Sequence, residues 1–382
     1  MRRKTVLRAL FAIIAVVFFA TPIALRSVGV TATAFENKRF AEAPKPSQGW
    51  DVFDQTTRFL TDRMPLREQA VRANNRLWQT FFGTAPRYGS QTADGALPFA
   101  GEGAAAGPGD PASDAAQVLE GRDGWLFVKG ALERACMPLA PAGPALKRWQ
   151  ELVSVVRSAG KPAVVTVPPD KGSIYAEHLR DGELTDCAQD ARPGFWDLLS
   201  RAPRDAGVIA LERPLQRLKQ STSVPLYSKT DSHWNSFAGL ELVRAALDEL
   251  GGGLELRPGE VVALGEREFL GDLTVLRGEQ TKDARPEHTI RRRPGARRIG
   301  GRTLYVTDSF GDVPLPLVKL YFSNVRRLPW LGPTPGELTD EIAAADRVIF
   351  VTVEREFAVR GSDAGPISRD FLELLRERLG TG

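Results

Sequence analysis

The sequence predicts an α/β fold in which helices cover a layered, mostly parallel β-sheet. Three short apolar runs, rich in β-branched residues, occupy residues 163–167, 303–306 and 348–353. Runs of this kind form strands that are buried on both faces. Two segments with apolar residues at helical spacing, residues 145–159 and 237–250, alternate with these runs. Strands that alternate with helices are typical of a layered α/β domain.

The chain begins with the pattern of a membrane anchor, which we expect within residues 1–30. Four basic residues within residues 1–8 precede an uncharged apolar run over residues 9–25. This run is at the short end of the lengths that cross a bilayer as a helix. Because basic residues stay on the cytoplasmic side, the rest of the chain is expected outside the cytoplasm, in a periplasm or at the cell surface. A cleaved signal peptide is the alternative, and it would export the same domain.

Two segments separate this anchor from the α/β domain. Apolar residues recur with helical spacing over residues 51–82, so a helical lead-in is expected within residues 35–83, divided at Pro65. Residues 84–116 are rich in Gly, Ala, Pro and Ser and hold few large apolar residues. Such a segment cannot bury enough surface to offset the entropy of ordering it, which predicts a flexible insertion.

The α/β domain itself is expected to occupy residues 117–380. Residues 121–127 predict a turn that enters a short strand, and residues 208–211 predict another strand. Three consecutive glycines end the helix expected at 237–250. An arginine-rich run at residues 291–298 is expected to form a solvated loop.

Charge and cysteine content bear on function as well. The formal net charge of +4 equals the four basic residues that precede the apolar run, so the exported part is close to neutral. Nucleic-acid binding is therefore not expected. Cys136 and Cys187 are an even pair without metal-binding spacing, which in an exported protein leaves open either one disulfide or two free thiols.

The first segment that carries chemistry is Asp231-Ser232-His233-Trp234-Asn235. On an extended chain, residues i and i+2 project to the same side, so the carboxylate of Asp231 can reach the imidazole of His233. An acid in that position fixes the tautomer of a catalytic histidine and stabilises its protonated form. A surface Asp–His pair, or a cap of the helix that follows, is the alternative.

The second segment, Thr307-Asp308-Ser309-Phe310-Gly311, follows directly on an apolar run. A strand that ends here places the hydroxyl of Ser309 at the carboxyl edge of the sheet, where ligands bind in open α/β folds. Backbone N–H groups at such an edge can stabilise an oxyanion. An ordinary turn after a strand is the alternative. Together, the two segments supply a nucleophile, a base and an orienting acid.

These segments, in this order, resemble the alginate O-acetyltransferase family of exported SGNH-hydrolase-like proteins. The block D-x-H-W followed later by D-S-F is specific, whereas the shorter matching pieces are not. The resemblance spans most of residues 35–357 apart from the predicted insertion. The matching pieces are Glu36–Arg39, Asp62–Arg67, Gly121–Phe127, Val167–Lys171, Asp231–Asn235 and Asp308–Phe310.

The resemblance implies an SGNH-hydrolase-like domain that carries out serine-dependent acetyl transfer. Ser309 would attack an acetyl donor, His233 would remove its proton, and Asp231 would orient His233. The acetyl group would pass to a hydroxyl of an extracellular or cell-wall polysaccharide, and the implied partner is a multi-pass membrane acyltransferase that supplies acetyl groups. No cofactor is expected, and no metal, because His178 and His288 show no ligand spacing with His233.

Three further residues are candidates for binding the substrate or the oxyanion: Asn235, Lys171 and Arg355. For Asn235 the alternative is the cap of a helix, and for Lys171 it is a solvated loop position. Trp234 is expected to pack in the core rather than to bind sugar. The family usually has a glycine where this chain has Thr307, and this difference would alter the turn before the serine.

Two other functions remain compatible with the sequence. An acetylesterase would use the same three residues with water as the acceptor, and the exclusion of water from the site decides between the two reactions. A polysaccharide-binding or assembly factor would keep the fold without catalysis. Such a factor has no need for Asp231, His233 and Ser309 together.

Overall fold

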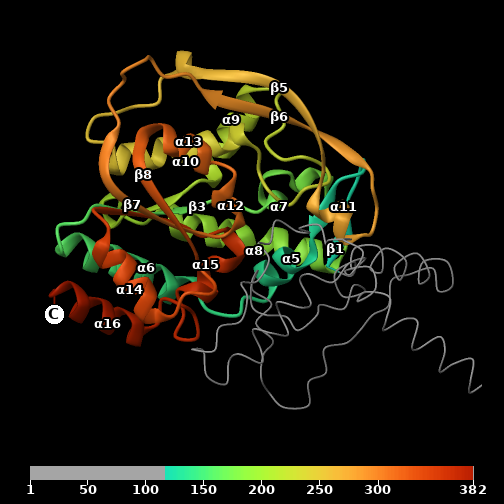
Figure 1. Cartoon of the computed structure of the whole chain (residues 1–382). Coiled ribbons are helices and arrows are strands. Elements are labelled where there is room, and N and C mark those ends of the chain that lie inside the picture. The colour runs from blue at the N-terminus through green and yellow to red at the C-terminus, as the bar shows by residue number, and fades with distance from the viewer. Residues whose placement is uncertain (1–116, 382) are drawn as a thin grey trace, which may run out of the picture. The chain divides into compact units, whose positions relative to one another are not determined.

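The computed structural model describes residues 117–381 (Figure 1). Residues 117–276 and 280–381 belong to one compact unit. The predicted anchor, helical lead-in and insertion lie outside the described residues, so they stay predictions. Within residues 117–381, no helix combines the length and the apolar character that crossing a bilayer requires.

A five-stranded sheet forms the centre of the unit, and all of its strands run parallel. The strand order is β4-β3-β9-β7-β8, which confirms the α/β fold with a parallel sheet. The three apolar runs of the sequence form the three middle strands, β3, β9 and β7. The five strands are β3 (Ala163–Val167), β4 (Val208–Ala210), β7 (Ile299–Thr307), β8 (Phe322–Pro329) and β9 (Arg347–Val351).

Both faces of this sheet are covered by helices, because the middle strands send apolar side chains to each side. In β7, Leu304 and Val306 belong to one hydrophobic cluster, and Tyr305 between them belongs to the other. Ile349 and Phe350 of β9 divide in the same way. Figure 1 shows α10 and α13 over one face, and α6, α14 and α16 over the other. Burial on two sides explains why these runs are continuously apolar.

The described helices include both of those predicted, with small shifts at their ends. The helix expected at residues 145–159 is α6, and the helix expected at 237–250 is α10, whose C-cap is the first of the three glycines, Gly251. The helices are α5 (Lys129–Cys136), α6 (Ala142–Ser158), α7 (Lys171–Ile174), α8 (Glu183–Ser200), α9 (Glu212–Ser221), α10 (Ser236–Leu250), α11 (Asp272–Leu276), α12 (Ser309–Asp312), α13 (Leu315–Tyr321), α14 (Pro335–Ala344), α15 (Glu354–Arg360) and α16 (Arg369–Leu379).

Two antiparallel ribbons accompany the central sheet. The turn predicted at residues 121–127 joins β1 (Val118–Glu120) to β2 (Leu126–Val128). A longer ribbon pairs β5 (Val261–Leu270) with β6 (Lys282–Ile290), and α11 lies in the connection between them. This ribbon and β8 were not among the elements predicted from the sequence. Most side chains of β5 are exposed, and β8 is an edge strand with several exposed positions, so neither strand is apolar along its whole length.

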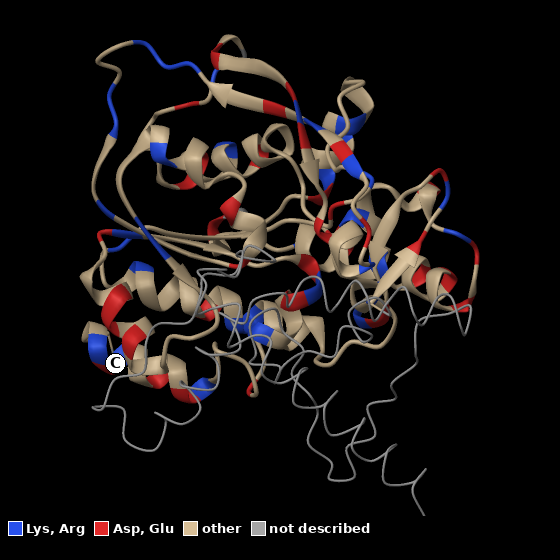
Figure 2. Cartoon of the chain, turned by 45° about the vertical axis from the view of Figure 1, so that its right-hand side comes forward, with Lys and Arg blue, Asp and Glu red and all other residues tan. Residues whose placement is uncertain are grey.

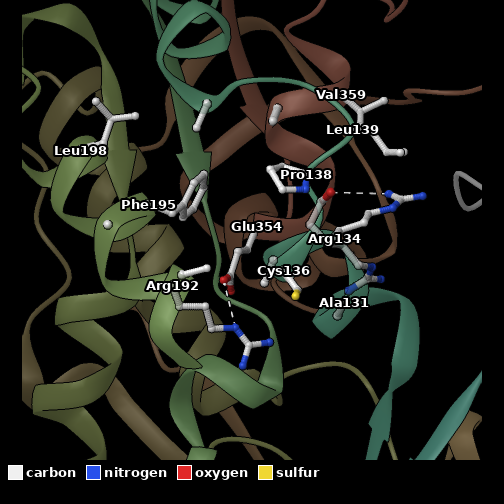
Figure 3. Close-up of a pocket in the computed structure, with 16 residues that line it drawn as sticks. Ala131, Arg134, Cys136, Pro138, Leu139, Arg192, Phe195, Leu198, Glu354 and Val359 are labelled. Carbon is white, nitrogen blue, oxygen red and sulfur yellow. Dashed lines mark hydrogen bonds and ion pairs between the residues drawn. The ribbon is translucent and has the colours of Figure 1, made fainter. Parts of the chain in front are cut away.

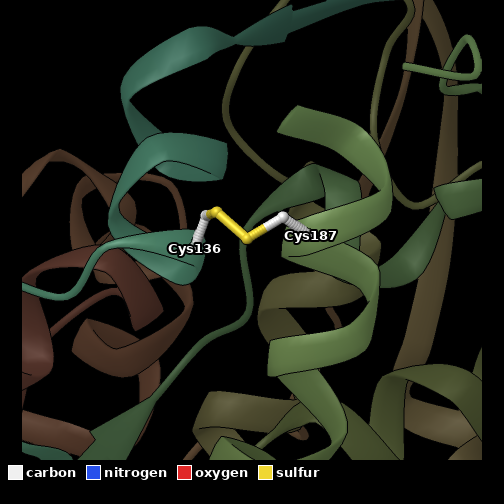
Figure 4. The surroundings of a disulfide bond; sticks show 2 residues. All are labelled: Cys136 and Cys187. Carbon is white, nitrogen blue, oxygen red and sulfur yellow. A yellow bond between two sulfur atoms is a disulfide. The ribbon is translucent and has the colours of Figure 1, made fainter. Parts of the chain in front are cut away.

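A disulfide joins α5 to α8 (Figure 4). Cys136 is the last residue of α5 and Cys187 lies in the first half of α8, with their Cα atoms 5.4 Å apart. Of the two states that the sequence left open for these cysteines, the structure has the disulfide. The bond ties together two helices that flank the candidate site described below.

The arginine-rich run forms the exposed loop between β6 and β7, as expected (Figure 2). Arg297 and Arg298 donate hydrogen bonds to backbone carbonyl oxygens of Gly252 and Phe322. The loop precedes β7, whereas Ser309 follows it. The arginine cluster therefore lies at the amino ends of the parallel strands, and the serine lies at their carboxyl ends.

Candidate active site

The chemistry-bearing residues gather at the carboxyl edge of the parallel sheet. Chain segments leave this edge after β3, β7 and β9, at residues 168–171, 308–311 and 352–355. The loop at residues 228–235, which precedes α10, packs against them through hydrogen bonds from Lys171 and to the carbonyl oxygen of Phe310. The structure thus brings together segments that lie far apart in the sequence.

Asp231 and His233 form the contact that their spacing suggested. Oδ1 of Asp231 accepts hydrogen bonds from Nδ1 of His233 at 2.9 Å and from the backbone N–H of His233 at 2.7 Å. Both side chains are largely buried. Burial by itself would raise the pKa of Asp231, but the hydrogen bond and the charge of His233 lower it below its usual value. The carboxylate therefore remains charged and can orient the imidazole.

A second carboxylate, which no sequence motif predicted, contacts the same imidazole. Oδ2 of Asp272, the first residue of α11, lies 3.3 Å from Nδ1 of His233. Oδ1 of Asp272 accepts the backbone N–H of Ser232 at 2.6 Å, and Oδ2 accepts its hydroxyl. Asp272 follows Gly271 on the connection of the β5–β6 ribbon, 39 positions from His233, and no short motif joins the two in the sequence.

Both carboxylates contact Nδ1 of the imidazole, so the other ring nitrogen, Nε2, is not engaged by either of them. Although burial would lower it, the pKa of His233 is raised well above 6.5 by its hydrogen bonds to Asp231 and Asp272. Nε2 of His233 is buried, and within residues 117–381 it has no hydrogen-bond partner. In a serine-dependent mechanism, Nε2 is the atom that takes the proton of the nucleophile.

Ser309 opens α12 immediately after β7, and its neighbours contact the histidine loop. The ring of Phe310 lies 5.2 Å from that of His233, measured between centroids. The carbonyl oxygen of Phe310 accepts the indole N–H of Trp234 at 2.7 Å. The two motifs therefore meet in space, and Ser309 precedes the residue that touches His233. Trp234 is fully buried, which confirms that it packs in the core.

The turn that carries Ser309 is closely packed at Thr307, the position at which the family usually has a glycine. Oγ1 of Thr307 donates to the carbonyl oxygen of Asp308 at 2.8 Å. A Cβ on Gly311 would overlap Oγ1 of Thr307 and approach the hydroxyl of Tyr305. The absence of a side chain at Gly311 is what allows Thr307 to occupy this place, so the turn forms despite the departure.

Asp308 anchors this turn to the segment that follows β9 and to α15. Its Oδ2 accepts hydrogen bonds from Nη1 of Arg360 at 2.6 Å and from the backbone N–H of Val353 at 2.9 Å. Its Oδ1 accepts the backbone N–H of Phe310 at 3.1 Å. The side chains of Asp308 and Arg360 are only 2% and 5% exposed. Asp308 is therefore the buried support of the turn that presents Ser309.

Replacing Arg360 with alanine is expected to lower the free energy of unfolding by about 3–5 kcal/mol, because the buried carboxylate of Asp308 loses its partner. A loss of that size lowers the Tm of a domain this large by roughly 10 °C. Urea unfolding followed by circular dichroism measures the change. Arg369→Ala is the matched control, since its ion pair with Asp363 is exposed, and exposed ion pairs contribute little to stability. Equal losses in the two variants would contradict the anchoring role.

Lys171 is buried, so the solvated loop position considered for it is wrong. Its Nζ donates to the backbone carbonyl oxygens of Ser228, Lys229 and Asp231, at 3.1, 3.0 and 2.7 Å. Burial lowers the pKa of Lys171 to about 7, against the raising effect of nearby carboxylates. These contacts use all three donors of an ammonium group to hold the histidine loop. A role for Lys171 in binding substrate stays a prediction.

The other two candidate side chains also make structural contacts. Asn235 caps α10, since its Oδ1 accepts the backbone N–H of Ala238 at 3.0 Å, and its amide nitrogen donates to the carbonyl oxygen of Pro225. The capping alternative is therefore confirmed for Asn235. Arg355 forms a buried ion pair with Asp170 and lies over the ring of Phe310, 5.3 Å from its centroid. Roles of Asn235 and Arg355 toward an oxyanion or substrate stay predictions.

A pocket of about 320 Å³ lies beside this site, between α5, α8 and α15 (Figure 3). Its walls are mainly apolar, and its polar lining includes Arg192, Glu354 and Arg355. Burial raises the pKa of Glu354 to about 7, although the charge of Arg192 opposes this shift. Because Arg355 both lines the pocket and contacts Phe310, the pocket adjoins the segment that carries Ser309.

Asp231, His233 and Asp272 also form a set of atoms close enough to hold a cation, all within 4.8 Å of one another. Nδ1 of His233 lies 2.9 Å from Oδ1 of Asp231 and 3.3 Å from Oδ2 of Asp272, so a protonated Nδ1 gives these carboxylates a hydrogen-bond donor. The other histidines lie elsewhere, where His178 stacks on Trp125 and His288 packs on Phe237. We therefore interpret the cluster as an acid–base group.

Comparison with known families gives a match over this part of the chain. The family described as "SGNH hydrolase-like domain, acetyltransferase AlgX" matches residues 118–316. The matched range includes the histidine loop, Asp272 and Ser309. It covers slightly more than half of the 382 residues.

Individual relatives are more distant. The probable alginate O-acetylase AlgJ of Pseudomonas syringae pathovar tomato is 27% identical over 168 residues, which are 41% of this chain and 40% of that protein. The O-acetyltransferase domain of Pseudomonas putida AlgJ matches with a TM-score of 0.46 and 20% identity, over 68% of this chain and 98% of that one. Pseudomonas aeruginosa AlgX matches with a TM-score of 0.46 and 14% identity, over 69% and 67% of the two chains.

Proposed function

Because the chain belongs to the family of SGNH hydrolase-like domains of the acetyltransferase AlgX, we propose that it is a serine-dependent O-acetyltransferase that acts on a polysaccharide. The observation that supports this most is the arrangement around His233. Its Nδ1 is held by carboxylates, and its Nε2 has no hydrogen-bond partner within residues 117–381. A histidine that acts as the general base for a serine needs one nitrogen held by an acid and the other able to accept the serine proton.

The proposed reaction passes through an acetyl-serine intermediate. Oγ of Ser309 attacks the carbonyl carbon of the acetyl donor while Nε2 of His233 takes the hydroxyl proton. The tetrahedral intermediate collapses, the leaving group takes that proton, and the acetyl group remains as an ester on Ser309. A sugar hydroxyl then attacks this ester and gives its proton to Nε2 of His233. Ser309 leaves with that proton, and the product is the acetylated sugar.

Asp231 contributes by stabilising the imidazolium that forms in each half of the reaction. Its charged Oδ1 accepts the Nδ1–H of His233 at 2.9 Å, so the positive charge that appears on the ring has a partner already in place. The backbone N–H of His233 donates to the same oxygen at 2.7 Å and helps to hold the carboxylate in place. The ring therefore stays in one tautomer with Nε2 available.

The acceptor, location and partner belong to the same proposal. The acceptor class is a polysaccharide, which is supported by the name of the relative, an alginate O-acetylase. The apolar N-terminal run with its preceding basic residues supports a membrane anchor and an extracytoplasmic catalytic domain. A multi-pass membrane acyltransferase would supply the acetyl groups from the other side of the membrane.

The test uses the full-length chain, purified in detergent, with a chromogenic acetyl ester and de-acetylated oligosaccharides. Mass spectrometry is expected to find an acetyl group on the peptide that contains Ser309, and acetylated oligosaccharide among the products. Both should vanish in Ser309→Ala and persist in Ser323→Ala, which removes an exposed hydroxyl on β8.

The other outcomes distinguish the alternative functions. Acetate release that depends on Ser309 without any transfer to oligosaccharide would identify an acetylesterase. Equal rates of acetate release and acetyl transfer in the wild-type chain and Ser309→Ala would contradict serine catalysis and favour a binding or assembly role.

A further inference from the structure

We propose that Asp272 is a positioning residue that acts through His233, forming with Asp231 a clamp of two carboxylates on the Nδ1–H of the imidazole. This inference deepens the proposed function and rests on it, because it assumes that His233 is the base. The usual catalytic triad needs one orienting acid. Here a second acid reaches the same ring nitrogen from a different part of the fold.

The geometry around Nδ1 supports a shared hydrogen bond. Oδ1 of Asp231 lies 2.9 Å from Nδ1, and Oδ2 of Asp272 lies 3.3 Å from it. Nδ1 carries one proton, so the nearer carboxylate takes the larger share and the farther one adds a weaker contact. Asp231 comes from the loop of His233 itself, whereas Asp272 comes from α11. Acceptors on two separate elements restrict rotation of the ring more than one acceptor can.

Asp272 is itself held firmly against the histidine loop. Its carboxylate accepts both the backbone N–H and the hydroxyl of Ser232. The backbone N–H of Leu273 donates to the carbonyl oxygen of Thr230 at 3.1 Å. A Cβ on Gly271 would overlap this same carbonyl group, so the glycine permits the close approach of the two segments. The connection of the ribbon is therefore docked onto the loop at residues 230–233.

Charged groups from each neighbouring element define the electrostatics of His233. Asp231 belongs to its own loop and Asp272 to α11, while Lys171 of α7 holds the carbonyl oxygens of the same loop. The α12 segment presents the uncharged ring of Phe310, with Arg355 of α15 on that ring. Oγ of Ser232 also lies 3.3 Å from Nδ1, so among the described residues the charged groups that contact the imidazole are the two carboxylates. They raise the pKa of His233 well above 6.5 in spite of burial.

A raised pKa has a defined consequence for the pH dependence of the enzyme. The base must be neutral to accept a proton, so kcat/KM is expected to increase with pH through the pKa of His233, on the alkaline side of 6.5. Removing the charge of Asp272 lowers that pKa, so the midpoint should move to lower pH by about one pH unit or more. The plateau at high pH should fall by roughly 10- to 100-fold, because the imidazolium loses one charge-assisted contact.

The experiment compares the full-length chain with Asp272→Asn, which keeps the shape of the side chain and removes its charge. The protein is labelled with ¹³C in its histidine rings, of which there are three. Titration by NMR gives the pKa of His233 without any assay of activity. Burial lowers the pKa of His288, so its signal should titrate on the opposite side of 6.5 from that of His233.

Two control variants separate the possible causes. Glu268→Gln removes a charge from the same ribbon at an exposed position and should leave the pKa of His233 unchanged. Ser232→Ala removes the hydroxyl that Asp272 accepts, together with its uncharged contact to Nδ1 at 3.3 Å, but leaves the charged carboxylate beside His233. If Asp272 served only to hold the loop, Ser232→Ala would reproduce the effects of Asp272→Asn. If Asp272 acts on the ring, Ser232→Ala should change the pKa of His233 much less than Asp272→Asn does.

The outcomes for this inference and for the proposed function are distinguishable. A pKa of His233 that falls in Asp272→Asn, together with a kcat/KM profile moved to lower pH, would support the clamp. An unchanged pKa in a folded Asp272→Asn protein would overturn it, even if Ser309→Ala abolishes acetyl transfer. Conversely, a lowered pKa in a chain without Ser309-dependent activity would support the clamp and reject the proposed reaction.

Discussion

Replacing His233 with glutamine is expected to lower kcat for acetyl transfer by about 10⁶-fold, the loss found when the base of a serine-dependent site is removed. Glutamine has no nitrogen that can accept the proton of Ser309. The loss should appear in stopped or continuous assays with the chromogenic acetyl ester and should not be recovered at high pH. His288→Gln is the matched control, since the ring of His288 packs on Phe237 of α10.

The same experiment tests whether His233 and Ser309 act as one unit. Ser309→Ala should give about the same loss as His233→Gln, and the double variant should lose almost nothing more, because members of a catalytic unit are strongly non-additive. If the fold-losses of the two single variants multiply in the double variant, then His233 and Ser309 contribute to the rate independently. That result would contradict a proton transfer between these two residues.

The second large effect is expected for Asp231→Asn, which should lower kcat by about 10⁴-fold. An asparagine can donate to Nδ1 of His233 and so stabilise the wrong tautomer, with the proton on Nε2. It also removes the charge that stabilises the imidazolium. Initial rates over a range of ester concentrations separate kcat from KM, and only kcat is expected to change strongly.

Asp283→Asn is the matched control for this prediction. Oδ2 of Asp283 accepts the backbone N–H and the hydroxyl of Thr230, at 3.2 and 3.1 Å, on the same loop. It supports the loop and makes no contact with His233. If Asp283→Asn caused as large a loss as Asp231→Asn, then the shape of the loop, rather than the orientation of the imidazole, would explain both results.

Much of the central sheet could be predicted because its signal is local. A strand buried on both faces is mainly apolar over its buried positions, as β3, the second half of β7 and β9 are. The edge strand β8 and the β5–β6 ribbon face solvent in part, so polar residues interrupt their pattern. These elements are defined by backbone pairing to distant segments, and nothing in their own sequence indicates the partner.

The contact of Asp231 with His233 could be predicted for a similar reason. The two residues are separated by one position, and the period of an extended chain places them on the same side. The meeting of the histidine loop with the segment of Ser309 was implied by resemblance to a family. No local rule connects residues 76 positions apart, as Trp234 and Phe310 are.

The sequence by itself determined the class of the fold, the middle strands, the pairing of acid and base, and the position of Ser309 after a buried strand. Only the tertiary structure decided the surroundings of these residues. It buried Lys171 among three carbonyl oxygens, paired Asp308 with Arg360, and brought Asp272 to His233. The physical reason is that burial and electrostatic contact depend on distance in space, whereas sequence patterns report only neighbours within a few residues.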